Sequence, residues 1–374
     1  MKRPRIAILA HFPLSYLHSA GTEPTEYHCV WLIVLHQILI SIKEYDFHWI
    51  VPDKSIQAPC VIKSGNQTFH QIPKARSTIG LYSAYAYDRW QIRKILKEVK
   101  PDLLHAWGTE NCYGLAASSF SGKKILSIQG LLVAYAQRAR LALFERLQGM
   151  FYEAYTLKRF THITTESPWA ADRVRELNPH AQVRCWEYAI SNSFYNIERE
   201  PYPEPCCIMA GSNTPVKNVL CAIRAFQRPE LSHIKLFIAG VNQGDYAELS
   251  DNIIPLGFIP HEDIAKRLSS SWCLVHPSLA DSCPNIVKEA RVIGLPAIVT
   301  HDCGAKQYVV DGQSGFVVRP DDDEALANAV LKVTQSKQTS LEMGEFDRAR
   351  CREAISQDTM LRGIKDLYAS ILEA

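Results

Sequence analysis

Short apolar runs alternate with helical stretches along this chain, and the alternation occurs in both halves. Runs this short and this apolar are typical of parallel strands that helices cover on both faces. We therefore predict two α/β domains, each built on a doubly wound parallel sheet. The expected strands are 6–10, 47–51, 103–107, 125–129 and 162–165 in the first half, and 206–210, 235–239, 252–256, 273–276, 297–300 and 315–318 in the second. The clearest expected helices are 90–99, 219–226, 262–269, 286–293 and 324–334.

A proline-rich stretch predicts the boundary between the two domains. Pro201, Pro203 and Pro205 form a stiff, extended linker, so the predicted domains are 1–198 and 199–356. A last helix is expected over 357–374, after the second domain's elements are complete. We expect it to pack outside that domain's core, with the first domain as its candidate partner. Its apolar stripe consists of Met360, Leu361, Ile364, Leu367, Tyr368, Ile371 and Leu372.

Two similar domains joined in this way predict a ligand in the cleft between them, at the carboxyl ends of the strands. Composition excludes some other classes. At 47% apolar and 21% charged residues, the chain is neither disordered nor a fibrous repeat. Residues 1–200 carry a net charge of +7 and residues 201–374 one of −5, so the whole chain is only +2. Nucleic acid is therefore not expected as a partner. The basic half is a candidate for contact with something anionic, and incidental unevenness is the alternative.

Cysteine usage and hydropathy predict a cytoplasmic protein. The eleven cysteines include no CxxC pair, which favours buried thiols in a reducing compartment over disulfides or a zinc site. The apolar stretch after Met1 is too short for a signal peptide and reads as a first strand. The apolar run 29–42 is shorter than the roughly 20 residues that cross a bilayer, so we predict a buried helix there.

The segment from His276 to Ala290 carries the sharpest chemical signal, since the chain has neither a GxGxxG fingerprint nor a phosphate-binding P-loop. A strand ends at His276, a turn carries Asp281, and a helix begins near Asn285. The amino end of a helix is a ready site for a phosphate. Glu289 lies one turn inside and leans back toward that end. Carboxylates beside an anion site fit a ligand with both hydroxyls and phosphates, namely a sugar nucleotide. A helix cap with a solvated glutamate is the alternative.

The second half also resembles the nucleotide-binding domain of retaining glycosyltransferases of the GT-B fold, in the family 4 group. That family carries two glutamates with seven intervening residues, and Asp281 and Glu289 match this spacing with aspartate in the first place. The resemblance covers roughly residues 205–335. Its further motifs are His276-Pro277-Ser278, Pro284-Asn285, Gly294-Leu295-Pro296 and Asp311-Gly312-Gln313-Ser314-Gly315.

The resemblance implies a role for each matching residue. Glu289 is expected to hold the ribose hydroxyls of the nucleotide, Asp281 to contact hydroxyls of the donor sugar, and Lys217 to clamp the diphosphate. A departure stands at Ser212, where the family has an arginine, so another cation is needed, and Lys306 is a candidate. The other donor-binding positions expected from the resemblance are Ser282, Cys283, Pro284, Asn285, Gly21 and Gln129.

In the first half, the match to the family is weaker. Gln129 stands where the family often has a histidine that ends a middle strand, and an amide cannot act as a base at neutral pH. We therefore assign no general base. His11, His105 and Glu110 lie at or near predicted strand ends, where polar residues are more often structural. Residues 131–160 predict a basic, aromatic amphipathic helix. That helix either contacts anionic lipid headgroups or a lipid-diphosphate acceptor, or covers the sheet of the first domain.

Together these observations predict a retaining, metal-independent glycosyltransferase without a cofactor. Its donor would be a nucleotide-diphospho-sugar on the second domain, and its acceptor a saccharide or lipid-linked saccharide on the first. The resemblance implies a role in bacterial cell-surface polysaccharide synthesis, in the cytoplasm at the inner face of the membrane. Two alternatives stay open. Ser212, Asp281 and Gln129 are compatible with a GT-B-like nucleotide-sugar-binding protein that has lost catalysis, and a nucleotide-sugar epimerase is a third reading.

Overall fold

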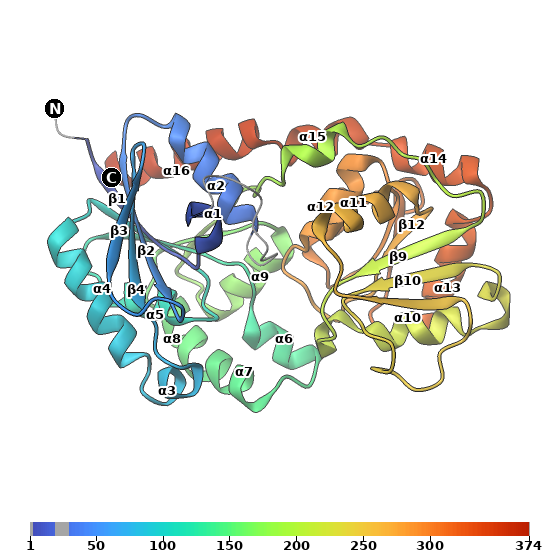
Figure 1. The fold of residues 1–374 in the computed structure, drawn as a ribbon, viewed down its shortest axis with the longest axis horizontal. Coiled ribbons are helices and arrows are strands. Elements are labelled where there is room, and N and C mark those ends of the chain that lie inside the picture. The colour runs from blue at the N-terminus through green and yellow to red at the C-terminus, as the bar shows by residue number, and fades with distance from the viewer. Residues whose placement is uncertain (1–2, 19–29, 374) are drawn as a thin grey trace. The chain divides into compact units, whose positions relative to one another are not determined.

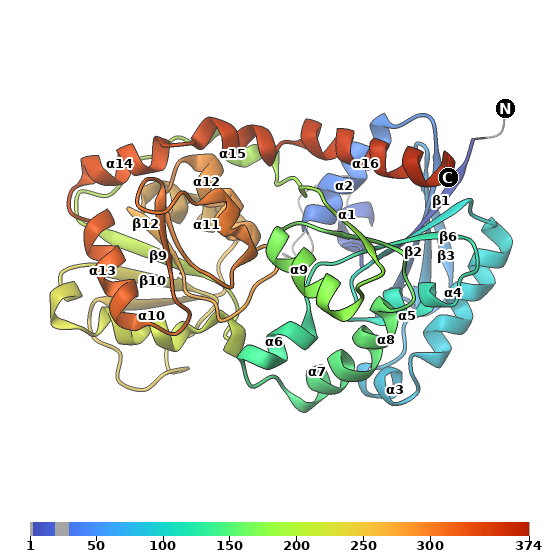
Figure 2. The same ribbon diagram turned by 180° about the vertical axis from the view of Figure 1, so that it is seen from behind.

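The computed structural model describes residues 3–18 and 30–373, which divide into two compact units (Figures 1 and 2). The N-terminal unit consists of Met1–Ala136, Ala142–Ala189 and Gln357–Ala374, and the C-terminal unit of Gln137–Leu141 and Ile190–Ser356. The division thus falls before the expected boundary at residue 198. Ile190 and Phe194 are buried in the core of the C-terminal unit, so this unit begins upstream of the proline-rich stretch.

The N-terminal unit is built on an eight-stranded sheet whose order is β3-β4-β2-β1-β5-β6-β7-β8. All neighbouring strands are parallel except β3 and β4. The central strands β1 and β5 are buried because both faces are covered by helices. The strands are β1 (Arg5–Leu9), β2 (Asp46–Asp53), β3 (Cys60–Ser64), β4 (Gln67–Pro73), β5 (Leu103–Trp107), β6 (Lys123–Ser127), β7 (His162–Thr165) and β8 (Gln182–Cys185).

One edge of this otherwise parallel sheet is antiparallel. Strands β3 and β4 pair antiparallel, with Ser64 opposite Gln67 and only Gly65 and Asn66 between them. Gly65 has a φ of +60°, a conformation that glycine adopts without strain and that a two-residue hairpin requires. The Asn66 amide donates to the carbonyls of Leu39 and Ile42, which fixes the turn against a helix end. The hairpin has little signal in the sequence, because β3 is short and largely exposed.

Helices cover both faces of this sheet. Helices α2 and α16 pack together on one face, whereas α4 and α5 pack together on the other (Figure 1). Residues 30–41 of the apolar run form the helix α2, which packs in the core as predicted. The helices of this unit are α1 (Leu14–His18), α2 (Val30–Ser41), α3 (Ser77–Tyr82), α4 (Ala86–Val99), α5 (Cys112–Ser118), α6 (Leu132–Arg138), α7 (Leu143–Leu147), α8 (Ala154–Leu157), α9 (Pro168–Leu177) and α16 (Gln357–Glu373).

The stretch 131–160 is not the single helix that its periodicity predicts. It breaks into α6, α7, a π-helix over Gln148–Glu153, and α8. The expected amphipathic helix is therefore wrong as a continuous element, although several of its apolar side chains remain exposed. Polar side chains inside the π-helix bond to neighbouring loops, and this competes with regular α-helical winding.

The last helix, α16, packs in the core of the N-terminal unit. Met360, Ile364 and Tyr368 are fully buried in the same apolar cluster as Ile6 and Phe47. The Tyr368 hydroxyl also hydrogen-bonds the His105 ring across 2.9 Å. The chain therefore returns to its first sheet after completing the second one.

The C-terminal unit is built on a six-stranded parallel sheet whose order is β11-β10-β9-β12-β13-β14. On one side of β9 lie β10 and then β11, and on its other side lie β12, β13 and β14. The order therefore reverses between β9 and β12, and ligands of open α/β sheets bind at such a point. The strands are β9 (Cys206–Ala210), β10 (Lys235–Ala239), β11 (Ile253–Gly257), β12 (Cys273–His276), β13 (Ala297–Thr300) and β14 (Gly315–Val318).

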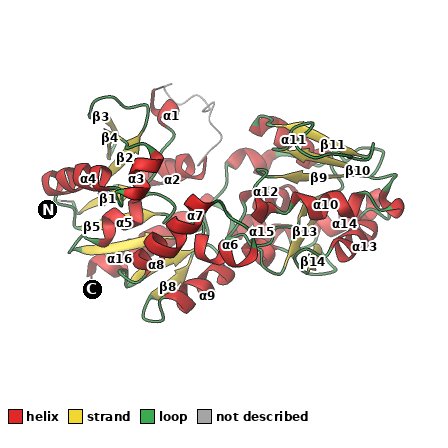
Figure 3. Ribbon diagram, turned by 90° about the horizontal axis from the view of Figure 1, so that it is seen from below, coloured by secondary structure: helices red, strands yellow, loops and turns green. Residues whose placement is uncertain are grey.

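Helices of this unit also cover both faces of their sheet, as the red and yellow elements of Figure 3 show. Helices α10 and α13 pack together over one apolar cluster, and α12 and α15 over the other. Of the cysteines that the structure describes, Cys60 and Cys185 are exposed and the others are buried, so the expectation of buried thiols fails at two positions. The helices are α10 (Val219–Phe226), α11 (His261–Ser270), α12 (Asn285–Ile293), α13 (Asp323–Val333), α14 (Lys337–Glu345) and α15 (Arg348–Ala354).

Candidate functional site

The loops that follow β9 and β12 bring two oppositely charged side chains together where the strand order reverses. Lys217 ends a short 3-10 turn after β9, and Asp281 stands in the loop after β12. The Lys217 Nζ lies 2.5 Å from the Asp281 Oδ2 and donates a hydrogen bond to it. The sequence analysis expected both residues at a donor site, and the structure places them in direct contact.

Further contacts fix the Asp281 carboxylate. The same Oδ2 lies 3.2 Å from the Nε2 of His276, the last residue of β12. The Asp281 backbone N–H donates to the carbonyl of Asp302, and its carbonyl accepts from the N–H of Gly304. The loop that carries Asp281 is therefore held to the loop that follows β13.

Burial and charge act in opposite directions on this carboxyl group. Burial by itself raises the pKa of Asp281, but Lys217 and His276 outweigh it, and the pKa lies well below its ordinary value. Burial lowers the pKa of His276, and the hydrogen bond with Asp281 only partly offsets this. In the neutral tautomer with its proton on Nε2, the His276 ring donates a hydrogen bond to the carboxylate. The arrangement holds one negative and one positive charge in place before any ligand arrives.

Glu289 lies one turn inside α12, as its spacing predicts, and is buried. Its Oε1 lies 3.3 Å from the Nε2 of His261, the first residue of α11. The His261 ring packs edge-on against Phe194, with 5.0 Å between the ring centroids. The sequence analysis missed His261, because its approach to Glu289 depends on how α11 and α12 pack.

The remaining expected donor residues of this unit lie on the same two loops. Ser282 and Cys283 are buried in the loop after β12, Pro284 is the N-cap of α12, and Asn285 is its first residue. Ser212 is exposed in the loop after β9, with its Oγ 3.2 Å from the Thr214 Oγ1. No cation thus replaces arginine at this position itself.

Two cations approach the loop after β13. Lys306, the candidate from the sequence analysis, donates to the carbonyl of His301 across 2.6 Å. Arg138, which belongs to the C-terminal unit through Gln137–Leu141, lies 3.0 Å from the Asp302 carboxylate. The Arg138 guanidinium, in the basic stretch 131–160, is therefore paired within the protein.

The expected residues of the first half have separate outcomes. Gly21 lies outside the described residues. Gln129 is half-buried just beyond β6 in the N-terminal unit. His105 is a core residue that bonds Tyr368 and Ser127, and burial lowers its pKa to about 3. His11 lies 3.9 Å from the Asp53 carboxylate. Glu110 is partly exposed in the loop after β5.

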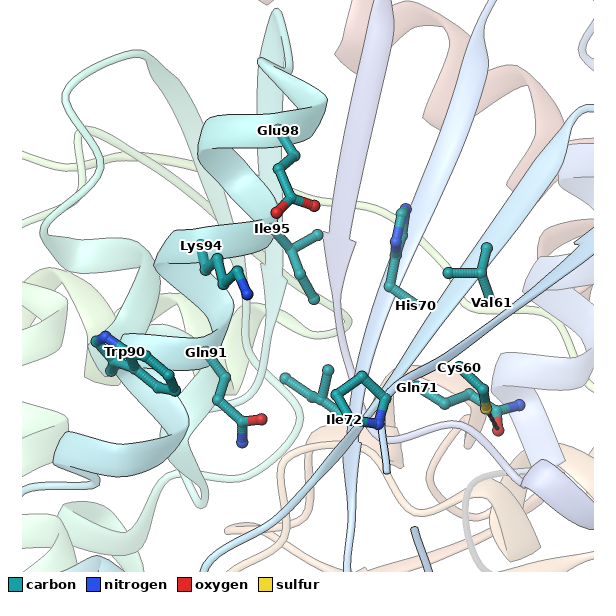
Figure 4. Close-up of a pocket in the computed structure, with 11 residues that line it drawn as sticks. Cys60, Val61, His70, Gln71, Ile72, Trp90, Gln91, Lys94, Ile95 and Glu98 are labelled. Carbon is teal, nitrogen blue, oxygen red and sulfur yellow. Dashed lines mark hydrogen bonds between the residues drawn. The ribbon is translucent and has the colours of Figure 1, made fainter. Parts of the chain in front are cut away.

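A cavity of about 220 Å³ lies elsewhere in the N-terminal unit, between β3, β4 and α4. Figure 4 shows Trp90, Lys94 and Glu98 of α4 across from His70 and Val61 of the two strands. None of the residues expected at the donor site lines this cavity.

Comparisons with known proteins bear on the same half of the chain. Residues 194–350 match the model of a family described as "Glycosyl transferases group 1". The capsular polysaccharide biosynthesis glycosyltransferase CapM of Staphylococcus aureus is 23% identical over 148 residues, which is 38% of this chain and 39% of that protein. The UDP-Gal:alpha-D-GlcNAc-diphosphoundecaprenol alpha-1,3-galactosyltransferase of Escherichia coli is 29% identical over 124 residues, 33% of this chain and 31% of that protein. The match thus spans well under half the length of these curated relatives.

Similarity of fold extends over the whole chain. The structure of sucrose-phosphate synthase from Thermosynechococcus elongatus superposes with a TM-score of 0.79, covering 99% of this chain and 100% of that one at 17% identity. At this level of identity the likeness shows the fold alone. The fold is GT-B, and the family match together with the relatives supports a glycosyltransferase of that fold.

Proposed function

We propose that this chain is a retaining, metal-independent glycosyltransferase whose nucleotide-diphospho-sugar donor binds to the C-terminal unit. The observation that carries the proposal is the group formed by Lys217, Asp281 and His276 where the strand order reverses, beside the amino end of α12. Neither a cofactor nor a metal ion takes part in the proposed reaction.

Each part of this site suits one part of such a donor. The first backbone N–H groups of α12 and its dipole favour the negative charge of phosphate. Glu289, buried one turn inside, is a hydrogen-bond acceptor for ribose hydroxyls, and His261 holds its carboxylate in one orientation. The diphosphate of the donor would then lie against Lys217 on the loop after β9, and the sugar against Asp281 on the loop after β12.

The proposed reaction breaks the bond between the sugar and the donor phosphate and forms a bond from the same carbon to an acceptor oxygen. The proton of the acceptor hydroxyl passes to the leaving phosphate, so no separate base is required. Negative charge develops on that phosphate in the transition state, and a cation held in position stabilises it. Lys217 is the cation that Asp281 holds in this way.

Acceptor and cellular role follow from the relatives rather than from the site. The names of two relatives describe capsular polysaccharide biosynthesis and transfer to a diphosphoundecaprenol-linked sugar. We extend this to a saccharide or lipid-linked saccharide acceptor on the N-terminal unit, in bacterial cell-surface polysaccharide synthesis.

An exposed apolar patch on the N-terminal unit supports contact with a membrane surface. Leu143, Met150, Phe151 and Tyr155 are between 45% and 69% exposed, and exposed Arg146, Lys158 and Arg159 flank them. Apolar side chains bordered by basic ones fit an anionic lipid surface. Among the described residues, no helix is long and apolar enough to cross a membrane.

Ligand binding tests the donor site first. The thermal midpoint is measured with UDP, GDP, ADP and their sugar conjugates, for the wild-type protein and for Glu289→Ala. We expect one nucleotide sugar to raise the midpoint of the wild-type protein and to lose that effect in the variant, whereas Glu262→Ala on the neighbouring helix keeps it. If the nucleotide sugar still raises the thermal midpoint of Glu289→Ala, the donor binds at another site.

The exposed Ser212 favours a second candidate, a nucleotide-sugar-binding protein without catalysis. If the wild-type protein transfers the sugar or hydrolyses the donor, and Lys217→Ala abolishes this activity, the protein is an enzyme. Nucleotide-sugar binding without turnover across a panel of acceptors decides for the binding protein.

A further inference from the structure

The loops after β5 and β6 enclose a carboxylate in the N-terminal unit. Glu110 follows β5, and its Oε2 accepts a hydrogen bond from the N–H of Thr109 across 2.9 Å. A Cβ built on Gly130 would lie 2.5 Å from the Glu110 Oε1, and one built on Gly108 would lie 2.5 Å from the Glu110 Oε2. Both positions therefore exclude any side chain as long as the carboxylate stays where it is.

Two more polar side chains border the same place. The Tyr135 hydroxyl would lie 3.5 Å from the Cβ built on Gly130, and the Gln129 amide carbon 3.9 Å from the one built on Gly108. Glu110, Gln129 and Tyr135 are all partly exposed. A carboxylate, an amide and a phenol present both donors and acceptors, which is the chemistry that recognises hydroxyl groups.

A buried framework holds this group in position. The two ends of the π-helix grip Thr109, since the Gln148 amide donates to its carbonyl across 2.9 Å and the Thr109 hydroxyl donates to Glu153 across 2.5 Å. Glu153 also accepts the N–H groups of Leu132 and Val133 at the start of α6. A π-helix is rare and is frequently found at functional sites. Here it fixes the loop that carries Glu110.

Glu153 has the structural role in this region, since it is fully buried and accepts three hydrogen bonds. Glu110 adds a second carboxylate close enough to raise the pKa of Glu153, although burial is the larger cause. Two neighbouring carboxylates repel each other, and backbone hydrogen bonds from Thr109 and Gly130 hold the Glu110 carboxylate in place against this repulsion. A carboxylate held in one orientation at a partly exposed position is available to a ligand hydroxyl.

The topology places Glu110 where ligands of such sheets bind. In the sheet, β2 lies on one side of β1, and β5 lies on its other side, followed outward by β6. The strand order therefore reverses between β1 and β5. Glu110 follows β5 directly at this reversal, in the position that corresponds to the Asp281 loop of the other unit.

We propose that Glu110 is an acceptor-binding residue, whose carboxylate accepts a hydrogen bond from a hydroxyl group of the sugar acceptor, with Gln129 and Tyr135 beside it. This inference rests on the proposed glycosyltransferase function and assigns the acceptor a place in it. Because the leaving phosphate takes the acceptor's proton, Glu110 orients the hydroxyl and does not remove its proton.

The test separates acceptor binding from donor binding. Transfer is measured for the wild-type protein, Glu110→Gln and Glu110→Ala, together with donor affinity and the slow hydrolysis of the donor without acceptor. Loss of a hydrogen bond to a charged group predicts a KM for the acceptor that rises about 10- to 100-fold in Glu110→Ala, and less in Glu110→Gln. Donor affinity and donor hydrolysis stay unchanged. Glu98→Gln, an exposed glutamate of α4 in the same unit, is the matched control and leaves all values unchanged.

Gly130→Ala provides a second variant that keeps the carboxylate. The added methyl group displaces it, so the KM for the acceptor rises while the thermal midpoint and donor affinity hold. An unchanged acceptor KM in Glu110→Ala overturns the acceptor contact and leaves the proposed function standing. Loss of donor affinity in Glu110→Gln overturns it in favour of a structural role. A wild-type protein that binds donor yet transfers to no acceptor overturns the proposed function, and this inference with it.

Discussion

Lys217 and Asp281 are 64 positions apart in the sequence, and their side chains meet at 2.5 Å in the C-terminal unit. Most of the Asp281 side chain is inaccessible to water, and about a quarter of the Lys217 side chain is accessible. The buried Asp281 charge therefore depends on Lys217, and the Lys217 side chain stays partly accessible to a ligand.

Lys217→Ala should affect both activity and stability. Removal of the lysine leaves the largely buried Asp281 carboxylate with the His276 ring still beside it, so the free energy of unfolding should fall by less than the cost of breaking a fully buried pair, which is about 3–5 kcal/mol. Loss of a positioned cation should lower kcat by about 10²–10³-fold. Urea unfolding and transfer kinetics measure the two effects. Lys235→Ala, which removes an exposed lysine that pairs with Glu204, serves as the control with small changes in both. Equal activity of wild type and Lys217→Ala would contradict the assigned role.

Ser212→Arg should strengthen the donor site. Ser212 is exposed at the position where the resembling family has an arginine, so a longer cationic side chain can enter without displacing core residues. A second cation near the diphosphate should raise kcat/KM for the donor by about 10-fold or more. Ser212→Met adds comparable length without charge and should give no gain. A gain in both variants would mean that bulk rather than charge matters.

Stability should fall with rising pH because of Glu153. Burial raises the pKa of this carboxyl group to about 7 in the folded protein, against the ordinary value of 4.5 in the unfolded chain. Between these values the folded state binds a proton that the unfolded state has lost, so the free energy of unfolding decreases as pH rises through this window and then levels off. Urea unfolding at a series of pH values measures the slope. Glu153→Gln should flatten it, whereas the exposed Glu98→Gln should leave it as it is.

Reversal of the basic side chains around the exposed apolar patch should abolish binding to anionic vesicles. The triple variant Arg146→Glu, Lys158→Glu, Arg159→Glu leaves Arg138 with Asp302 and removes the attraction to lipid headgroups. Co-sedimentation with vesicles of phosphatidylglycerol and phosphatidylethanolamine measures binding, and its salt dependence checks the electrostatic part. The same reversal at Lys94 and Lys97 on α4 should change little. A triple variant that still sediments with the vesicles would rule out this surface.

Ile364→Ala should destabilise the N-terminal unit. The Ile364 side chain is fully buried between α16 and the first sheet, and truncation of a buried isoleucine costs about 2–5 kcal/mol. Leu361, on the same helix but only partly buried, should cost less when it is replaced by alanine. Urea unfolding measures both. Equal small effects would mean that α16 is loosely attached.

The strands and the helix α12 could be read from the sequence because their signals are local. In the C-terminal unit, β9, β10, β12, β13 and β14 begin and end at the predicted residues. Short apolar runs, turn residues and the spacing between Asp281 and Glu289 depend only on neighbours along the chain. The same local logic failed over 131–160, where helical periodicity does not reveal the side-chain bonds that wind one part into a π-helix.

The sequence by itself thus predicted two α/β units with parallel sheets, the positions of most of their strands, and the residues that stand at the carboxyl ends of those strands. The tertiary structure alone decided which of those residues meet. In that structure Lys217 pairs with Asp281, and His261 lies beside Glu289. His105 is buried beside Tyr368, and Glu110 lies between Gly108 and Gly130. The physical reason is that secondary structure follows from interactions a few residues long, whereas these contacts join distant segments that only the packing of complete sheets and helices brings within hydrogen-bond distance.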